Sequence, residues 1–216
     1  MQPSGRKRAS ALSFEITEVA ATGLFGFEGA AIGALAGLDL LGVIVVGMCS
    51  ALAGGVLRDI LLGDIPPAAF RSPRRIIVAF CAALLGFAVA AAPGIHPDAF
   101  ALNLFDALAL SLFAATGAQK AFERDANGWV VVILGTIAAT GGSVARDLLI
   151  NQSPVVLTTS VYATAAAAGA AIYFLCAVRR VPAPVALMAA IGVAFGLRVA
   201  ALVWNWQLPH LGVTRQ

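Results

Sequence analysis

The sequence is poor in charged, polar and reactive side chains. Only 12% of its 216 residues are Asp, Glu, Lys or Arg, whereas a typical globular domain has about 25%. Cysteine occurs three times, and histidine and tyrosine twice each. Since 60% of the residues are apolar and the mean hydropathy is +0.91, the polar side chains are too few to cover a surface in water. This shortage excludes a soluble domain, a disordered chain and a secreted scaffold held together by disulfides.

The shortage of charged and reactive side chains also argues against most kinds of binding and catalytic site. The formal net charge is only +3, so no basic stripe exists to bind nucleic acid. His96 and His210 stand alone, without the spacing of metal ligands. No GxxxxGK[ST], GxSxG or HExxH pattern occurs, and no histidine within an apolar run is available to activate Ser143. We therefore expect no enzyme activity, no metal and no cofactor.

What the chain has instead is a series of long apolar runs. About 20 apolar residues span a bilayer as a helix. The runs cover residues 13–36, 40–63, 74–93, 101–122, 128–150, 155–178 and 183–204. They predict an all-α, polytopic membrane protein with seven transmembrane helices in one domain, residues 1–216. The short connections predict that consecutive helices are antiparallel neighbours.

Basic residues gather in alternate connections between these runs. One side of the membrane receives Arg6, Lys7, Arg8, Arg71, Arg74, Arg75, Arg124, Arg179 and Arg180, and the other receives Arg215. Because cytoplasmic loops carry an excess of Lys and Arg, the N-terminus is expected in the cytoplasm. Membrane lipid is the expected surrounding of all the helices.

The sequence also matches itself at an offset of 88 residues. The segment 53–59, AGGVLRD, aligns with 141–147, GGSVARD. Further pairs in this register are Phe25 with Phe113, Gly29 with Gly117, Gly47 with Gly135, Leu61 with Leu149 and Pro66 with Pro154. The pattern predicts two three-helix repeats, at about 13–93 and 101–178, followed by an additional helix at about 183–204. Since three crossings is an odd number, the second repeat is expected to be inverted relative to the first.

A glycine pair lies inside one helix of each predicted repeat. Gly54 and Gly55 lie in the second predicted helix, and Gly141 and Gly142 lie in the fifth. Such a pair costs about 2 kcal/mol of helix stability, and helices interrupted in this way border the solute path of many inverted-repeat folds. We expect each helix to be kinked and broken there. The alternative is that the glycines let two helices pack closely.

Each glycine pair is followed by an Arg-Asp pair at membrane depth, Arg58-Asp59 in the second predicted helix and Arg146-Asp147 in the fifth. Adjacent residues do not face each other on a helix, so we expect these charges to bond to the other repeat or to backbone carbonyls. In the alternative interpretation each Arg extends to the membrane interface and each Asp caps a short helix.

Two further charges lie within predicted spans. Lys120, close to the cytoplasmic end of the fourth helix, either extends to the interface or projects into an aqueous path as a barrier or gate. Glu28 lies near the centre of the first helix, too deep for its short side chain to reach water, and is expected to pair with an Arg or Lys. Charges nearer the helix ends need only water or a helix dipole: Glu15, Glu18, Asp106 and Arg198.

With these motifs the chain resembles prokaryotic members of the TRIC family, the trimeric intracellular cation channels. The resemblance rests on two repeats plus one helix, on the Arg-Asp motifs at 54–59 and 142–147, and on the segment 117–121 around Lys120. It implies a homotrimer in the bacterial inner membrane, in which each protomer conducts potassium and, less selectively, other monovalent cations such as sodium. The chain departs from the family pattern at Ala53 and Ser143, where a third glycine often occurs.

The leading hypothesis is therefore a potassium-preferring cation channel. Pore-lining or gating roles fall on Lys120, Arg58, Arg146, Glu28, Asp59 and Asp147, and helix kinks on Gly54, Gly55, Gly141 and Gly142. The alternative is a secondary transporter of a small zwitterion such as glycine, in which helix N-termini bind the carboxylate and freed carbonyls bind the ammonium. A third hypothesis, a non-conducting membrane scaffold, leaves the repeated glycine pairs unexplained.

Overall fold

The computed structural model describes residues 5–92, 98–158 and 161–206, and within these ranges every regular element is a helix. The helices are α1 (Gly5–Leu35), α2 (Leu40–Leu61), α3 (Ala68–Arg71), α4 (Pro73–Ala91), α5 (Ala99–Phe122), α6 (Gly128–Leu149), α7 (Val155–Thr158), α8 (Ala163–Val178) and α9 (Ala183–Val203). Six of them, α1, α2, α4, α5, α6 and α9, are long and apolar enough to cross a membrane, and α8 is a shorter apolar helix. The predicted all-helical membrane fold is confirmed, with one of its seven helices shorter than expected.

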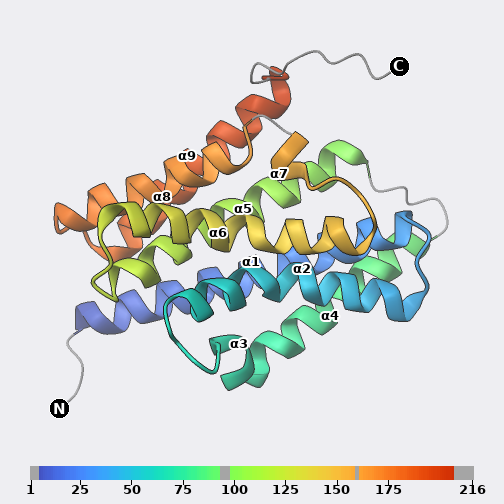
Figure 1. The fold of residues 1–216 in the computed structure, drawn as a ribbon, viewed down its shortest axis with the longest axis horizontal. Coiled ribbons are helices and arrows are strands. Elements are labelled where there is room, and N and C mark those ends of the chain that lie inside the picture. The colour runs from blue at the N-terminus through green and yellow to red at the C-terminus, as the bar shows by residue number, and fades with distance from the viewer. Residues whose placement is uncertain (1–4, 93–97, 159–160, 207–216) are drawn as a thin grey trace.

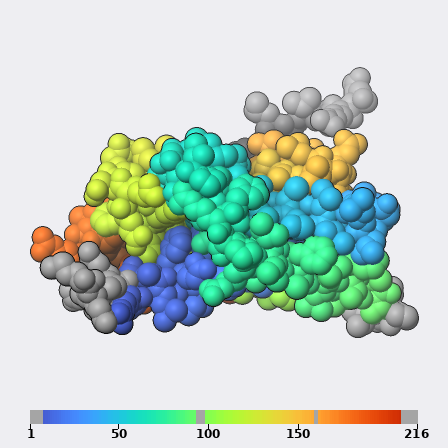
Figure 2. Space-filling model, turned by 90° about the horizontal axis from the view of Figure 1, so that it is seen from below, coloured from blue at the N-terminus to red at the C-terminus, as the bar shows by residue number. Residues whose placement is uncertain are grey.

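The long helices form an elongated bundle (Figure 1). α2 packs along α6, α1 packs against α2, α4 and α5, and α9 packs against α5 and α8. α3 and α4 lie at one edge of the bundle, and α8 and α9 lie at the opposite edge. Figure 2 shows the face where the α2–α3 connection and α4 cross the surface. Large apolar side chains such as Leu41, Ile77, Leu85, Met188 and Val203 are exposed, as a lipid surrounding requires.

Glycine lets α2 and α6 approach each other at backbone distance. A Cβ atom on Gly54 would lie 2.1 Å from the Ala138 carbonyl oxygen, and one on Gly142 would lie 2.1 Å from the Ser50 carbonyl oxygen. Residue 54 faces 138 while residue 142 faces 50, so the two helices run antiparallel. The two contacts involve residues that are equivalent at the offset of 88.

The helix breaks expected at the glycine pairs are absent. α2 continues through Gly54 and Gly55, and α6 continues through Gly141 and Gly142. A Cβ on Gly141 would lie 2.9 Å from the Gly54 Cα atom, so three of the four glycines serve the close contact between the helices. The prediction of an interruption is wrong, because the unoccupied Cβ positions are filled by the neighbouring backbone. A bend of either helix axis, which needs no interruption, stays a prediction.

Two helix boundaries also differ from the prediction. α1 begins at Gly5 rather than near residue 13, because its polar first turns contact other helices; for example, the Gln119 side-chain amide donates to the Ser10 hydroxyl at 3.0 Å. The sixth predicted helix is divided into α7 and α8. The start of α7 is capped by Asp147, whose carboxylate accepts the Val155 N–H at 2.8 Å.

Candidate functional site

Buried charged side chains gather in two clusters, one at the C-terminal end of α2 and the other at the C-terminal end of α6. Because the two helices are antiparallel, the clusters lie toward opposite ends of the bundle. The Lys120 cluster consists of Glu18, Arg58, Asp59, Asp64, Arg75 and Lys120. The Glu28 cluster consists of Glu28, Asp106, Arg146, Asp147, Tyr162 and Arg198.

Arg58 is the centre of the Lys120 cluster. It is fully buried and forms an ion pair with Glu18 on α1. Its Nε–H donates to the Asp59 Oδ1 atom at 2.8 Å. The other oxygen of Asp59 accepts the N–H of Ala68, the first residue of α3, at 2.9 Å. The buried guanidinium is thus compensated by two carboxylates, which a charge in this setting requires.

Lys120 extends from α5 to the end of α2. Its Nζ atom lies 2.7 Å from Asp59 Oδ1 and 2.8 Å from Asp64 Oδ2, and only 13% of its side chain is exposed. Asp64 also pairs with Arg71 at 2.8 Å and with Arg124 at 3.2 Å. The Lys120 ammonium, with Arg71 beside it, holds the pKa of the Asp64 carboxyl well below its usual range. Lys120 therefore joins α5 to α2 through an ion pair rather than extending free to the interface.

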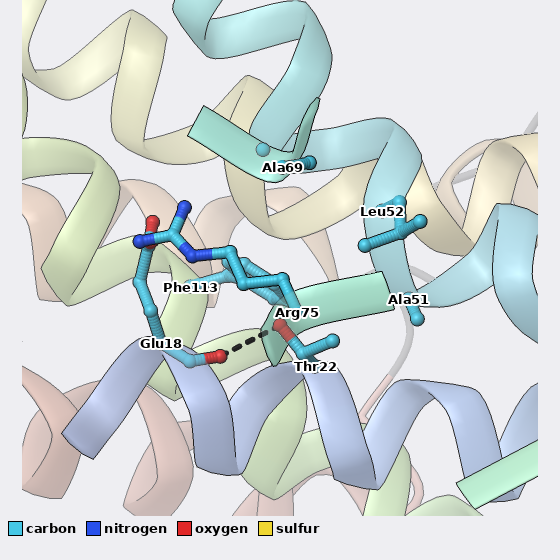
Figure 3. Close-up of a pocket in the computed structure, with 8 residues that line it drawn as sticks. Glu18, Thr22, Ala51, Leu52, Ala69, Arg75 and Phe113 are labelled. Atoms are coloured by element: carbon cyan, nitrogen blue, oxygen red, sulfur yellow. Dashed lines mark hydrogen bonds and ion pairs between the residues drawn. The ribbon is translucent and has the colours of Figure 1, made fainter. Parts of the chain in front are cut away.

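A small pocket opens beside this cluster (Figure 3). Glu18, Thr22, Gly55, Arg75 and Phe113 are among its lining residues. The Arg75 Nη2 atom lies 2.5 Å from Glu18 Oε2, and the Thr22 hydroxyl donates to the Glu18 carbonyl oxygen at 2.8 Å. Its cavity volume of about 10 Å³ is the space of roughly one water molecule. The pocket reaches Phe113, whose ring stacks on that of Phe25 at a centroid distance of 5.7 Å.

Arg146 is the centre of the Glu28 cluster. Its Nη1 atom lies 2.5 Å from Glu28 Oε1 on α1, and its Nε–H donates to the Asp147 Oδ1 atom at 2.8 Å. Asp147 in turn accepts the N–H of Val155 at the start of α7. Glu28 is buried, and the pairing with an arginine that its depth suggested is present.

Asp106 connects the Glu28 cluster to the last helices of the chain. It accepts the Tyr162 hydroxyl at 2.8 Å, and its carboxylate lies 3.6 Å from Arg198 on α9 and 3.8 Å from Arg146. The Arg198 guanidinium also lies 4.8 Å from the centroid of the Tyr162 ring, within range of a cation–π interaction. All four side chains are buried.

The two clusters are built on equivalent positions. Arg58 and Asp59 correspond to Arg146 and Asp147 at the offset of 88, and Glu18 corresponds to Asp106. Sequence reasoning assigned Glu18, Asp106 and Arg198 to water or a helix dipole, and these three assignments are wrong because all three side chains are buried in ion pairs. The offset of 88 that joins Glu18 to Asp106 is the signal that was available for finding these two. Tyr162 and Arg198 carried no such signal, since neither has a matching residue in the first half.

Comparison with known proteins matches two separate stretches of the chain. A family model described as Glycine transporter matches residues 15–91 and 103–178, two stretches whose starts are 88 residues apart. The UPF0126 inner membrane protein YadS of Escherichia coli K12 is 30% identical over 193 residues, 89% of this chain and 93% of that protein. A UPF0126 membrane protein of Deinococcus radiodurans is 39% identical over 157 residues, 71% of each chain.

Solved structures match over most of the chain. A TRIC channel from Rhodobacter sphaeroides shares 32% identity at a TM-score of 0.84, covering 89% of this chain and 98% of that one. A second TRIC cation channel structure shares 36% identity at a TM-score of 0.83, covering 94% and 99%. The chain belongs to the TRIC family. It is a multi-pass protein of the cell membrane, as the name of the Escherichia coli relative and the six spanning helices indicate.

The TRIC fold places the basic connections at one end of the bundle. The start of α1, the α5–α6 connection and the α8–α9 connection share an end in Figure 1. Arg71 and Arg124, from two different connections, meet at Asp64. The side of the membrane that this end faces, and with it the cytoplasmic N-terminus, stays a prediction. His96 and His210 lie outside the residues that the structure describes.

In this TRIC chain each arginine of the Arg-Asp motifs bonds to the aspartate next to it, which the sequence analysis did not expect. The motif lies in the last turn of each helix, where the long arginine side chain can fold back to its neighbour. Arg58 and Arg146 are buried, so neither extends to the membrane interface. The capping part of the alternative interpretation is confirmed, because Asp59 and Asp147 accept the first N–H groups of α3 and α7.

Proposed function

We propose that this chain is a potassium-preferring, monovalent-cation channel, and that each protomer of a homotrimer contains a path bordered by α2 and α6. The observation that carries the proposal is the similarity, at TM-scores of 0.83 to 0.85 over 89% to 94% of the chain, to structures named as TRIC channels. Potassium and sodium are the expected ions. The matched structures are channels rather than enzymes, in keeping with a transport role.

We infer that the path lies between two inverted three-helix repeats, at about 13–93 and 101–178, with the helix at about 183–204 appended. Two reciprocal contacts support this arrangement, Gly54 against residue 138 and Gly142 against residue 50. The family model that matches the chain at two places 88 residues apart supports it too. Antiparallel α2 and α6 at the centre are the arrangement expected around a two-fold axis in the membrane plane.

The charged residues of the path are compensated in this conformation. Lys120 is paired with Asp59, and Arg146 is paired with Glu28 and Asp147. Ion pairs thus cross between helices at both ends, and the pocket beside Phe113 has space for roughly one water molecule. We interpret this conformation as closed, so opening requires cross-helix ion pairs to separate.

Current through the purified protein in a planar bilayer tests the proposal. Under a potassium chloride gradient we expect discrete openings that reverse near the potassium equilibrium potential, because a cation path excludes chloride. Sodium substituted for potassium on one side then measures the preference between them. A silent bilayer, with folded protein shown to be inserted, would contradict the channel function.

Lys120→Ala is expected to raise the open probability several-fold, because it removes the ion pair that joins α5 to α2. Assembly should persist, since Asp64 keeps Arg71 and Arg124 and Asp59 keeps Arg58. Single-channel recording measures the change, and Arg179→Ala, at an exposed position, is the control. Unchanged openings in a folded Lys120→Ala protein would remove this residue from the path.

A transporter of a small zwitterion is the second candidate, and the description of the matching family model as Glycine transporter favours it. The uninterrupted α2 and α6 do not provide the half-helix ends that bind a carboxylate in such transporters. Counterflow of radiolabelled glycine into proteoliposomes separates the two functions. Saturable exchange without current would replace the channel proposal.

A further inference from the structure

Ion pairs join the first half of the chain to the second half at both ends of the bundle, and two of them connect equivalent helix pairs. Glu28 of α1 contacts Arg146 of α6 at 2.5 Å, and Lys120 of α5 contacts Asp59 of α2 at 2.7 Å. At the offset of 88, α5 is the equivalent of α1 and α6 is the equivalent of α2. The two contacts therefore join equivalent helix pairs at opposite ends of the bundle. Their charges are reversed, since the residue on α1 is acidic and the residue on α5 is basic.

Neither contact has a duplicate in the other half. The residue equivalent to Glu28 is Thr116, and the residue equivalent to Lys120 is Ile32. The Thr116 hydroxyl donates to the Leu112 carbonyl oxygen in its own helix at 3.1 Å, and Ile32 has no charge. Each end of the bundle thus has its own cross-half ion pair, and Glu28 supplies the one at the α6 end.

Glu28 also changes the partner of Arg146. In the first half, Arg58 pairs with Glu18, whose equivalent in the second half is Asp106. Arg146 nevertheless lies 3.8 Å from Asp106 and 2.5 Å from Glu28. Arg146 therefore pairs across the halves with Glu28 on α1, while it keeps its bond to Asp147 on its own helix.

The charge balance of the Glu28 cluster indicates that Glu28 is not needed to compensate its arginines. Two other carboxylates, Asp106 and Asp147, face the two guanidinium groups of Arg146 and Arg198. With Glu28 present, three buried carboxylates face two arginines. Buried charges without a counter-charge are costly, so Glu28 adds a carboxylate that the two arginines do not need for neutrality.

Access from the two ends also differs. At the Lys120 end, Gly55 lines the pocket that reaches Phe113. Its equivalent at the other end is Ser143, whose side chain is fully buried and donates to the Thr140 carbonyl oxygen at 2.9 Å. At this level a buried side chain stands at the Glu28 end, whereas a glycine borders the small pocket at the Lys120 end.

We propose that Glu28 is a gating residue, and that its ion pair with Arg146 closes the end of the path opposite Lys120. This inference rests on the proposed channel function. The Glu28–Arg146 and Lys120–Asp59 ion pairs then act as two gates in series, and each must separate before an ion passes. Glu28→Thr, which installs the residue found at the equivalent position, opens the α6 end while leaving two carboxylates to compensate two arginines.

Thiol accessibility tests this gate without any measurement of current. In a background in which Cys49, Cys81 and Cys176 are replaced by alanine, Ser143→Cys supplies a buried probe beside the Glu28 cluster. A charged, water-soluble methanethiosulfonate reagent should modify it slowly, and Glu28→Thr should speed the modification about ten-fold by shifting the population toward the open end. Glu28→Gln, which keeps the side-chain shape, should act in the same direction.

Lys120→Ala is the matched control for this experiment. It separates the contact at the other end, so the modification rate at position 143 should stay unchanged. An equal rate in the Glu28→Thr, Glu28→Gln and unsubstituted proteins, all eluting as folded oligomers, would overturn the gate. A faster rate in a protein that carries no current would instead contradict only the channel function.

Single-channel recording then tests the arrangement in series. If the gates are independent, the fold-increases in open probability produced by Glu28→Thr and by Lys120→Ala multiply in the double variant. An open probability that Glu28→Thr leaves unchanged, or a double variant that behaves as Lys120→Ala, would contradict a second gate.

Discussion

Replacing Gly142 by alanine is expected to destabilise the protein by about 3 kcal/mol, the upper end of the usual cost of overpacking. The new Cβ atom would lie 2.1 Å from the Ser50 carbonyl oxygen, whereas real Cβ atoms essentially never come within 3.0 Å of another heavy atom. The obstacle is backbone, so no side chain can rotate away and α2 must move off α6. Gly54→Ala is expected to have the same effect, because it meets the Ala138 carbonyl oxygen at the same distance.

Unfolding of the purified variants in detergent measures this difference. Gly196→Ala on α9 is the matched control, because a Cβ atom there meets nothing within 4 Å. Replacing a helical glycine in open space by alanine should raise the stability of the protein by up to about 1 kcal/mol. Gly142→Ala and Gly196→Ala are therefore expected to change stability in opposite directions. Equal stability of Gly142→Ala and Gly196→Ala would show that α2 and α6 do not pack at this distance.

Arg146→Ala is expected to destabilise the protein by about 3–5 kcal/mol, because it removes one partner of a buried ion-pair network. Glu28 and Asp147 would then have no basic partner among the described ion pairs, and Asp106 would keep only Arg198. The same substitution at Arg58 should cost less. Glu18 would keep Arg75 at 2.5 Å, and Asp59 would keep Lys120 at 2.7 Å.

The decisive comparison is whether Arg146→Ala lowers the stability more than Arg58→Ala does. Unfolding of the purified variants in detergent measures both losses. Arg74→Ala is the control, since that side chain is 66% exposed and lies 3.6 Å from Glu15; a surface pair of this kind contributes little. Adding Glu28→Thr to Arg146→Ala should recover part of the loss by removing an unpaired carboxylate. An Arg58→Ala protein less stable than Arg146→Ala would contradict the partner assignment at both ends.

Contacts between helices explain where sequence reasoning failed. A glycine pair in an apolar run is compatible both with a break and with close packing, and the two differ only in whether another backbone lies beside the glycines. In this fold the Ala138 and Ser50 carbonyl oxygens occupy those positions. Glu18 and Asp106 were assigned to water for a similar reason, because their distance from a helix end does not reveal the arginine that α2 or α6 brings to each.

The sequence by itself determined that this protein lies in a membrane, that its residues match one another at an offset of 88, and which family it resembles. These properties follow from composition, from the period of apolar runs and from matched residues. All three can be read along the chain without knowing which helices are in contact. Only the tertiary structure decided that Lys120 pairs with Asp59 and Glu28 with Arg146. Partners separated by 61 and 118 residues are chosen by the packing of whole helices, because a buried charge must take whichever counter-charge the neighbouring helix brings within reach.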